Sequence, residues 1–137
     1  MLRKLQNYFK DPETIDVGVM YEKYNFPTSF EPHLLTRKDM LARKNYLKEE
    51  LEEFHNAIDQ ENLTEAIDAL IDIVVFAKGT AVMMGVEWKP HWDEVMRANM
   101  SKKPGPVAKR PDMPYDLKKP KGWVGPDHQK IIDRTHW

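Results

Sequence analysis

The fold of this chain is decided by two short stretches, residues 48–54 (KEELEEF) and residues 65–72 (EAIDALID). Each stretch carries carboxylates beside apolar residues at helical spacing, and the second lies in a segment that is apolar almost throughout. Helices joined by a short connection pack antiparallel. We therefore expect an antiparallel helix pair that brings the two sets of acids together.

The first stretch belongs to a helix expected over residues 37–59, which begins after the capping sequence Thr36–Asp39. At about 100° per residue, Glu50 and Glu53 project from one flank of this helix, whereas Glu49 points farther out. A solvated glutamate-rich face, with lysines one turn away, is the alternative. The residues at core spacing, expected to form the buried face, are Leu47, Leu51, Phe54 and Ile58.

The second stretch belongs to a helix that opens at Asn62 and stops at Gly85. Hardly any polar face remains on it, so it belongs in the middle of a bundle or at an interface between subunits. A small monomer cannot bury such a helix, so we expect a homodimer or homotetramer. The sequence thus predicts an all-α helical bundle, built on an antiparallel helix pair and completed by oligomerisation.

The acids of this apolar helix are Glu65, Asp68 and Asp72. Burying an unpaired carboxylate is costly, so these groups must meet cations, metal or water. Lys78 is the only basic residue within the helix, and it lies about 120° around the axis from Asp72, too far to neutralise all three. Glu65 serves either as part of a capping box or as a ligand.

Four carboxylates, Glu50 and Glu53 facing Asp68 and Asp72, offer the oxygen ligands that hard cations prefer. The chain has no cysteine, which excludes thiolate sites. Without Glu-x-x-His pairs on these helices, Mg²⁺ is favoured over a di-iron centre, and Mn²⁺ is the expected substitute.

The remainder of the chain limits the other possibilities. The sequence has 137 residues and no apolar run of bilayer length, so we expect a cytoplasmic protein without a membrane partner. Residues 101–137 carry a balance of +5 and residues 1–100 a balance of −6. The chain has no dense basic helix, so we do not expect nucleic acid as a partner. Short helices are expected over residues 16–25 and 90–99.

Six of the ten prolines follow Ser101, which predicts an extended, irregular tail. Its tryptophans, Trp123 and Trp137, predict that it packs on the body or on a neighbouring subunit. We therefore expect a helical domain over residues 1–103, which carries the acids, and a basic, proline-rich extension over residues 104–137.

The stretches Leu47–Phe54 and Asp68–Asp72, followed by Gly79 and Gly85, resemble the MazG-like all-α nucleoside triphosphate pyrophosphohydrolases. Residues 95–103 are similar to the Asn-x-x-Lys stretch of phage-type members. The resemblance covers about residues 16–103. It implies Mg²⁺-dependent cleavage of a nucleoside or deoxynucleoside triphosphate to the monophosphate and pyrophosphate. Some phage-type relatives prefer a guanine nucleotide, for which the residues here give no reason.

The resemblance also implies roles for individual acids. Glu50 and Glu53 match the family's Glu-x-x-Glu pair, and Asp72 matches the closing acid of its Glu-x-x-Asp pair. Ala69 stands where that second pair has glutamate, and Asp68 is the expected replacement. Besides Glu50 and Glu53, the catalytic set includes Glu49, as general base, further ligand or solvated acid. The predicted metal ligands are Glu50, Glu53, Asp72, Asp68 and Glu65.

The predicted substrate contacts combine the Asn-x-x-Lys stretch with basic residues that can approach a triphosphate. They are Asn99, Lys102, Lys78, Arg110 and Lys119. Two other functions remain open at this point. One is phosphoribosyl-ATP pyrophosphohydrolysis on the same architecture, and the other is a non-catalytic helical interaction module.

Overall fold

The computed structural model describes residues 1–135, which form six helices and one two-stranded sheet. The predicted all-α class is therefore confirmed. The chain divides into two compact units, Met1–Trp88 and the part that begins at Lys89. The boundary expected after residue 103 lies inside the second unit. Within residues 1–135, no single helix is long and apolar enough to cross a membrane.

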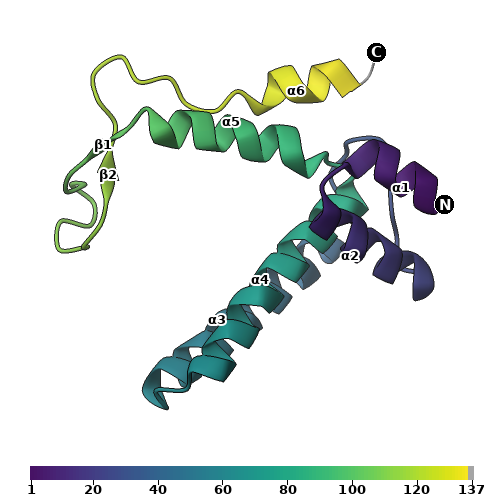
Figure 1. Ribbon diagram of the computed structural model, residues 1–137, viewed down its shortest axis with the longest axis horizontal. Coiled ribbons are helices and arrows are strands. Elements are labelled where there is room, and N and C mark those ends of the chain that lie inside the picture. Colours follow the sequence, from purple (N-terminus) through teal and green to yellow (C-terminus); the bar gives the residue numbers. More distant parts are fainter. Residues whose placement is uncertain (136–137) are drawn as a thin grey trace. The chain divides into compact units, whose positions relative to one another are not determined.

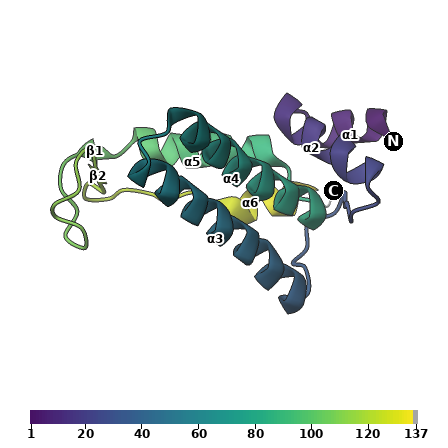
Figure 2. The same cartoon turned by 90° about the horizontal axis from the view of Figure 1, so that it is seen from below.

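The first unit is built from four helices, and its longest two form the predicted pair. Helices α3 and α4 run side by side in opposite directions (Figures 1 and 2). Helix α2 packs on α4, and α1 packs on α2. The four helices are α1 (Leu2–Phe9), α2 (Pro12–Lys23), α3 (Arg37–Asp59) and α4 (Leu63–Met84).

Capping side chains set the starts of α3 and α4 where the sequence predicts them. Thr36 Oγ1 accepts a hydrogen bond from the Asp39 backbone N–H at 3.2 Å, which satisfies a free donor of the first turn of α3. Asn62 Oδ1 accepts from the Glu65 N–H at 3.1 Å and does the same for α4.

Gly85 ends α4 for two reasons. Its φ of 66° lies in the left-handed region that favours glycine. A Cβ atom at this position would also lie 2.4 Å from the carbonyl oxygen of Glu31, in the loop between α2 and α3. Tyr8 of α1 donates a hydrogen bond to the Gly85 carbonyl. The end of α4 is thus fixed against two other segments of the unit.

The hydrophobic core of this unit lies where α1 and α2 cover the C-terminal half of α4. Tyr8 and Phe30 pack against it edge to face, with ring centroids 5.3 Å apart. The core therefore lies toward the C-terminal end of α4, away from the α3–α4 turn. Its buried side chains are Leu5, Phe9, Val17, Tyr21, Val82 and Met83.

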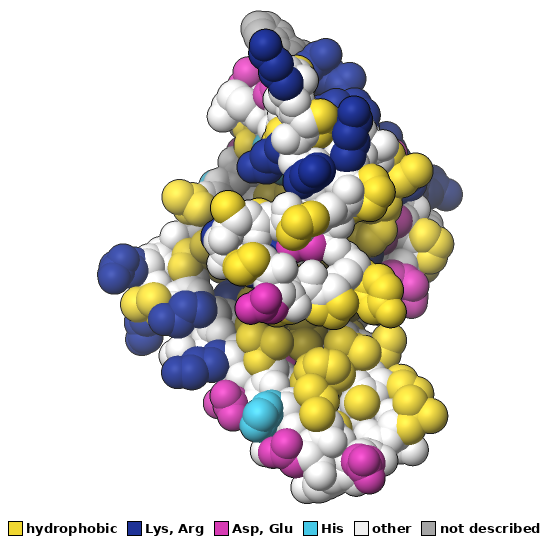
Figure 3. Space-filling view, turned by 90° about the vertical axis from the view of Figure 1, so that its left-hand side faces the viewer, with side chains coloured by type: hydrophobic (Ala, Val, Ile, Leu, Met, Phe, Trp, Pro, Cys, Tyr) yellow, Lys and Arg dark blue, Asp and Glu magenta, His cyan; other side chains and the backbone are white. Residues whose placement is uncertain are grey.

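Two predictions for this unit are wrong. The helix expected from residue 16 begins at Pro12, because Asp11 caps it and proline suits the first helical turn. The expected core positions Leu51 and Ile58 are each 56% exposed. Within the single chain α3 packs mainly on α4, and one neighbour cannot cover its whole apolar stripe. Figure 3 shows the resulting hydrophobic surface over the α3–α4 hairpin, in the lower part of the view.

The second unit contains more regular structure than the predicted irregular tail. Strands β1 and β2 pair antiparallel, with Lys103 opposite Lys118. Helix α6 follows Asp127, whose carboxylate accepts from the Lys130 N–H at 3.1 Å. An aspartate at this position is a signal for the start of a helix. The prediction of an irregular tail gave more weight to the number of prolines. The elements are α5 (Trp88–Met100), β1 (Lys103–Pro104), β2 (Leu117–Lys118) and α6 (His128–Thr135).

Candidate metal centre and adjoining pocket

Three carboxylates meet between the two long helices. Glu50 and Glu53 lie one turn apart on α3, and the antiparallel packing of α4 brings Asp72 opposite them. One oxygen from each residue lies within 4.8 Å of the others. These three acids are among the five metal ligands that the sequence predicts.

The surroundings of the cluster suit a hard cation. Glu50 Oε2 is buried and has no hydrogen-bond partner. Among residues 1–135, no basic side chain forms an ion pair with Glu50, Glu53 or Asp72. A buried carboxylate oxygen without a partner is costly, and a divalent ion held by carboxylates removes that cost. The residues present therefore fit a Mg²⁺-type ion.

Crowding of like charges alters the acidity of the cluster. Burial raises the pKa of Glu50 to about 7, helped by a hydrogen bond with Glu53 and by the charges of Asp72, Glu53 and Asp68. Burial, followed by the charges of Asp68 and Glu53, also raises the pKa of Asp72. Without a cation, the cluster holds protons that isolated carboxylates lose.

The other predicted acids take different positions. Asp68 lies outside the group of three, yet its charge acts on both Glu50 and Asp72. Glu65 is exposed, and its backbone N–H receives the Asn62 cap. Glu49 is exposed on α3. The structure thus gathers Glu50, Glu53 and Asp72, with Asp68 near enough to act through its charge.

Lys78, a predicted substrate contact, is enclosed in the first unit. Its ammonium lies 2.9 Å from Asp11 Oδ2 and 3.1 Å from Thr14 Oγ1, both at the start of α2. It also lies 4.5 Å from the centroid of the Trp88 ring. These contacts occupy the cation, so its surroundings are those of a structural ion pair.

The remaining predicted substrate contacts belong to the second unit. Lys102 and Lys119 place their ammonium groups 5.1 and 5.0 Å from the Trp123 ring centroid. The Trp123 indole N–H donates to the Ala98 carbonyl at 2.9 Å, so this part of the tail packs on α5. Trp137 lies outside the described residues.

Arg110 and Asn99 have partners close by in the same unit. Arg110 forms a two-point ion pair with Asp116, at 2.5 and 3.0 Å. The Asn99 carbonyl accepts from the Lys102 N–H at 3.1 Å, in the turn that closes α5.

A pocket of about 310 Å³ adjoins the acid cluster and shares Glu50 and Asp72 with it. The pocket was not predicted from the sequence, although Arg43, Tyr46 and Glu50 stand at i, i+3 and i+7 and so share one face of α3. The other walls come from α2, from α4 and from the loop after α2. The lining residues are Met20, Tyr21, Phe26, Arg43, Tyr46, Glu50, Asp72, Val75 and Phe76.

Aromatic rings and one guanidinium dominate this pocket. Tyr46 and Phe76 stack with ring centroids 5.0 Å apart and planes 16° from parallel. The Arg43 guanidinium carbon lies 5.5 to 5.6 Å from the centroids of Tyr21, Tyr46 and Phe76. The lining of the pocket thus combines aromatic rings and one guanidinium with the carboxylates of Glu50 and Asp72.

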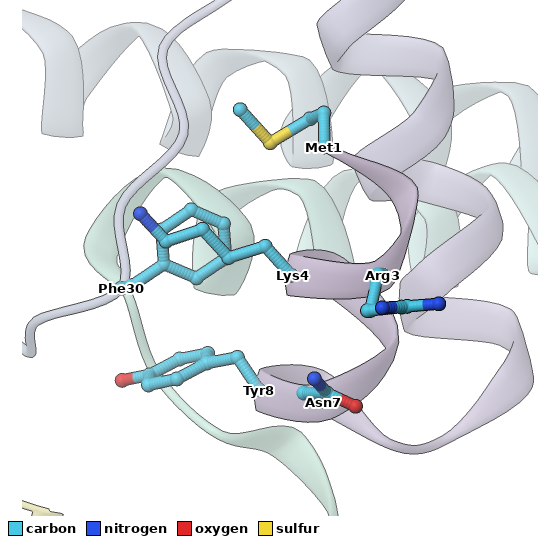
Figure 4. Close-up of a pocket in the computed structure, with 6 residues that line it drawn as sticks. All are labelled: Met1, Arg3, Lys4, Asn7, Tyr8 and Phe30. Atoms are coloured by element: carbon cyan, nitrogen blue, oxygen red, sulfur yellow. The ribbon is translucent and has the colours of Figure 1, made fainter.

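A second hollow in the first unit has the opposite character. It measures about 510 Å³ and is lined by Met1, Arg3, Lys4, Asn7, Tyr8 and Phe30. Figure 4 shows Lys4 reaching across the Phe30 ring, 4.5 Å from its centroid. No carboxylate lines this hollow, so it lacks the anionic oxygen ligands of the acid cluster.

The fold and the acid cluster define an all-α protein with a candidate metal centre on its helix pair. A family model for phosphoribosyl-ATP pyrophosphohydrolase matches residues 3–99, a span that includes the whole α3–α4 pair. The chain belongs to the phosphoribosyl-ATP pyrophosphohydrolase family, part of the MazG-like nucleotide pyrophosphohydrolase superfamily. The resemblance noted from the sequence is confirmed. A search of curated proteins found no match.

Proposed function

We propose that the protein is a Mg²⁺-dependent pyrophosphohydrolase that converts nucleoside or deoxynucleoside triphosphates to the monophosphate and pyrophosphate. Family membership supports nucleotide pyrophosphohydrolysis in general. The observation that carries the specific proposal is the convergence of Glu50, Glu53 and Asp72, with one oxygen of Glu50 buried and unpaired.

In this proposal, Glu50, Glu53 and Asp72 hold the ion, and Asp68 adds negative charge beside them. Mg²⁺, or Mn²⁺ in its place, neutralises phosphate charge and increases the acidity of water when it is bound. Hydrolysis adds the oxygen of water to the α-phosphorus and breaks its bond to the bridging oxygen, which leaves with pyrophosphate. Glu49 is exposed beside Glu50, and of the roles left open for it we propose that of proton acceptor.

The proposed substrate contacts are Asn99, Lys102, Arg110 and Lys119. Lys78 is left out because it is buried and its ammonium is already bound by Asp11 and Thr14, whereas Arg110 is exposed. A preference for guanine nucleotides and a cytoplasmic location also stay predictions.

We also propose that the working protein is a homodimer or homotetramer. Exposed apolar side chains on both helices of the α3–α4 pair support this assembly, because large exposed apolar patches mark interaction sites. They include Leu51, Ile58, Ile67, Leu70, Ile71 and Val74.

Two other functions make different predictions. The family description favours phosphoribosyl-ATP as an alternative substrate for the same acid cluster. In a non-catalytic interaction module the acids would only solvate a face of the protein, and ion-pairing partners for Asp68 and Asp72 would support this function. No ion pair to Asp68 or Asp72 occurs among the described residues, which counts against that reading.

The test is a panel of ribonucleoside and deoxyribonucleoside triphosphates, with phosphoribosyl-ATP added, assayed with Mg²⁺ for release of pyrophosphate. Glu50→Gln and Asp72→Asn should each abolish release, whereas Glu52→Gln, an exposed neighbour on α3, should keep it. Equal activity in all variants would contradict the metal assignment. Release of pyrophosphate from phosphoribosyl-ATP alone would favour the alternative substrate. No release from any compound of the panel would favour the interaction module.

A further inference from the structure

We infer that the pocket beside the acid cluster receives the nucleobase of the substrate, and that Arg43 selects bases carrying a carbonyl oxygen. This inference rests on the proposed function, because it takes the triphosphate to lie at Glu50, Glu53 and Asp72. The inference has two parts, the location of the base and a chemical rule for which bases are preferred.

The position of the pocket follows from the residues it shares with the cluster. Glu50 and Asp72 contribute both to the group of three acids and to the pocket wall. One ligand can therefore have its phosphates at these carboxylates and its base in the pocket. The volume of about 310 Å³ is at the small end of the range for ligand sites, which suits a single flat ring system. Aromatic side chains on the walls suit stacking with any base.

Arg43 is a buried cation without an anion. The residue is 8% exposed, and no carboxylate within residues 1–135 forms an ion pair with it. Buried charges are normally paired, so an unpaired guanidinium in a pocket wall indicates a polar group that arrives with a ligand.

Part of the guanidinium is already occupied, which leaves a defined donor. Its Nε donates to Thr80 Oγ1 at 2.9 Å, and its Nη2 donates to Tyr21 Oη at 2.5 Å and to the Phe76 carbonyl at 3.2 Å. Nη1 makes no hydrogen bond within the described part of the chain and is not among its buried unpaired atoms. The N–H groups of Nη1 are therefore the ones left for a ligand.

Gly79 holds this donor in place. A Cβ atom on Gly79 would lie 2.0 Å from Tyr21 Oη and 2.8 Å from Arg43 Nη2, so only glycine lets both groups reach the backbone of α4. Tyr21, Arg43 and Gly79 come from α2, α3 and α4, and their contact fixes the guanidinium relative to all three helices. A donor with a fixed position discriminates between ligands that a flexible one would tolerate.

The rule for choosing bases follows from hydrogen-bond chemistry. A guanidinium only donates, so Nη1 needs an acceptor. Guanine and uracil carry a carbonyl oxygen where adenine and cytosine carry an amino group, which is itself a donor. An amino group in that place sets a donor against the Nη1 donor, and a ligand that covers Nη1 without offering it an acceptor is strongly disfavoured. We expect GTP to be preferred over ATP, and UTP over CTP.

The experiment uses the full chain, with Arg43→Lys as the main variant and Arg3→Lys, an exposed arginine of the other hollow, as the matched control. The specificity constant kcat/KM is measured with Mg²⁺ for GTP, ATP, UTP and CTP. Binding of GMP and AMP, which the proposed reaction does not hydrolyse, is measured with Mg²⁺ by titration calorimetry. Arg43→Lys should reduce both the GTP/ATP ratio and the GMP/AMP affinity ratio by about tenfold or more, and Arg3→Lys should leave both ratios unchanged.

A second variant keeps the test decisive if Arg43→Lys does not fold. Tyr46 is 43% exposed, so Tyr46→Leu removes a stacking surface without opening the core. It should weaken GMP and AMP binding alike and leave their ratio unchanged. Unweakened binding in Tyr46→Leu would overturn the location of the base.

The outcomes separate this inference from the proposed function. Pyrophosphate release with ratios that Arg43→Lys does not alter, or a wild-type preference for ATP, would overturn the inference and leave the proposed function standing. A GMP preference that depends on Arg43, without pyrophosphate release from any nucleotide, would support the base site and contradict the proposed function. Failure of the wild-type protein to bind GMP would overturn the base site.

Discussion

The ammonium of Lys78 lies 2.9 Å from the carboxylate of Asp11, and their side chains are only 7% and 14% exposed. The same Asp11 oxygen accepts the Thr14 N–H and hydroxyl hydrogen bonds at the start of α2. One contact therefore joins the C-terminal half of α4 to the cap of α2, between residues far apart in the sequence.

Removing this cation should destabilise the fold strongly. Lys78→Met leaves the Asp11 carboxylate buried and uncompensated, and breaking a buried pair in this way typically costs about 3–5 kcal/mol. Urea unfolding at neutral pH measures the change in the free energy of unfolding. Lys44→Met, at an exposed position on α3, should stay within about 0.5 kcal/mol of wild type. A loss below about 1 kcal/mol in Lys78→Met would contradict a structural role for the pair.

Adding one methyl group at Gly79 should disturb both stability and the pocket. Gly79→Ala places a Cβ atom 2.0 Å from Tyr21 Oη, and overpacking a core typically costs about 1–3 kcal/mol. Thermal unfolding followed by circular dichroism measures the loss. Gly125→Ala is the control, because its nearest contact, with the Trp123 ring, is an ordinary 3.4 Å. Unfolding at equal temperatures in the two variants would argue against the close packing of Tyr21 on α4.

Mg²⁺ should stabilise the wild-type protein. Binding to the folded state alone raises the unfolding free energy by about 2.7 kcal/mol at 100 times the dissociation constant. Thermal unfolding with Mg²⁺ or with EDTA measures the difference. Glu50→Gln and Asp72→Asn should lose most of it, and Glu52→Gln should keep it. A shift that survives in both cluster variants would place the ion elsewhere.

The metal-free protein should lose stability as the pH rises toward neutrality. Burial raises the pKa of Glu50 from 4.5 to about 7, so between these values the folded state holds a proton that the unfolded state releases. The contribution is fully present below about pH 4.5 and is lost as the pH rises through about 7. Denaturant unfolding in EDTA across this range tests the slope, which Glu50→Gln should flatten.

Mg²⁺ affinity should follow the opposite trend, because carboxylate ligands must lose their protons before they bind. Affinity should rise as the pH passes through about 7, as measured by calorimetry. An affinity independent of pH between 6 and 8, or an unchanged slope of stability in Glu50→Gln, would contradict the raised pKa of Glu50.

Charging the exposed surface of α4 should break up an assembly formed through it. Ile71 is 58% exposed in the single chain, and Ile71→Lys would place a charge inside the proposed interface. Sedimentation velocity should show a smaller species, with helical content preserved. Leu34→Lys, which changes an exposed apolar residue outside α3 and α4, should leave the mass unchanged. A monomeric wild-type protein would contradict the proposed assembly.

Local chemistry explains which features could be predicted from the sequence. Thr36, Asn62 and Gly85 act within a few residues of themselves, so the bounds of α3 and α4 follow from them. Helical geometry and the short connection between α3 and α4 are also local features, and they bring Glu50, Glu53 and Asp72 together.

Features that depend on distant partners could not be predicted. The sequence suggests a free cation at Lys78, because its partner Asp11 lies 67 positions away. Arg43 is buried by contacts with Tyr21 and Thr80, which lie on other helices. Leu51 and Ile58 have the spacing of core residues, but a single chain does not supply the surface that would cover them.

The contact of Tyr21, Arg43 and Gly79 bears on the thermodynamics of ligand binding. Three helices hold the guanidinium before any ligand arrives, so its rotamers are already restricted in the free protein. Binding then requires little further loss of side-chain entropy, which is the advantage of a preorganised site. Tight packing at Gly79 would thus contribute to ligand affinity as well as to the stability of the fold.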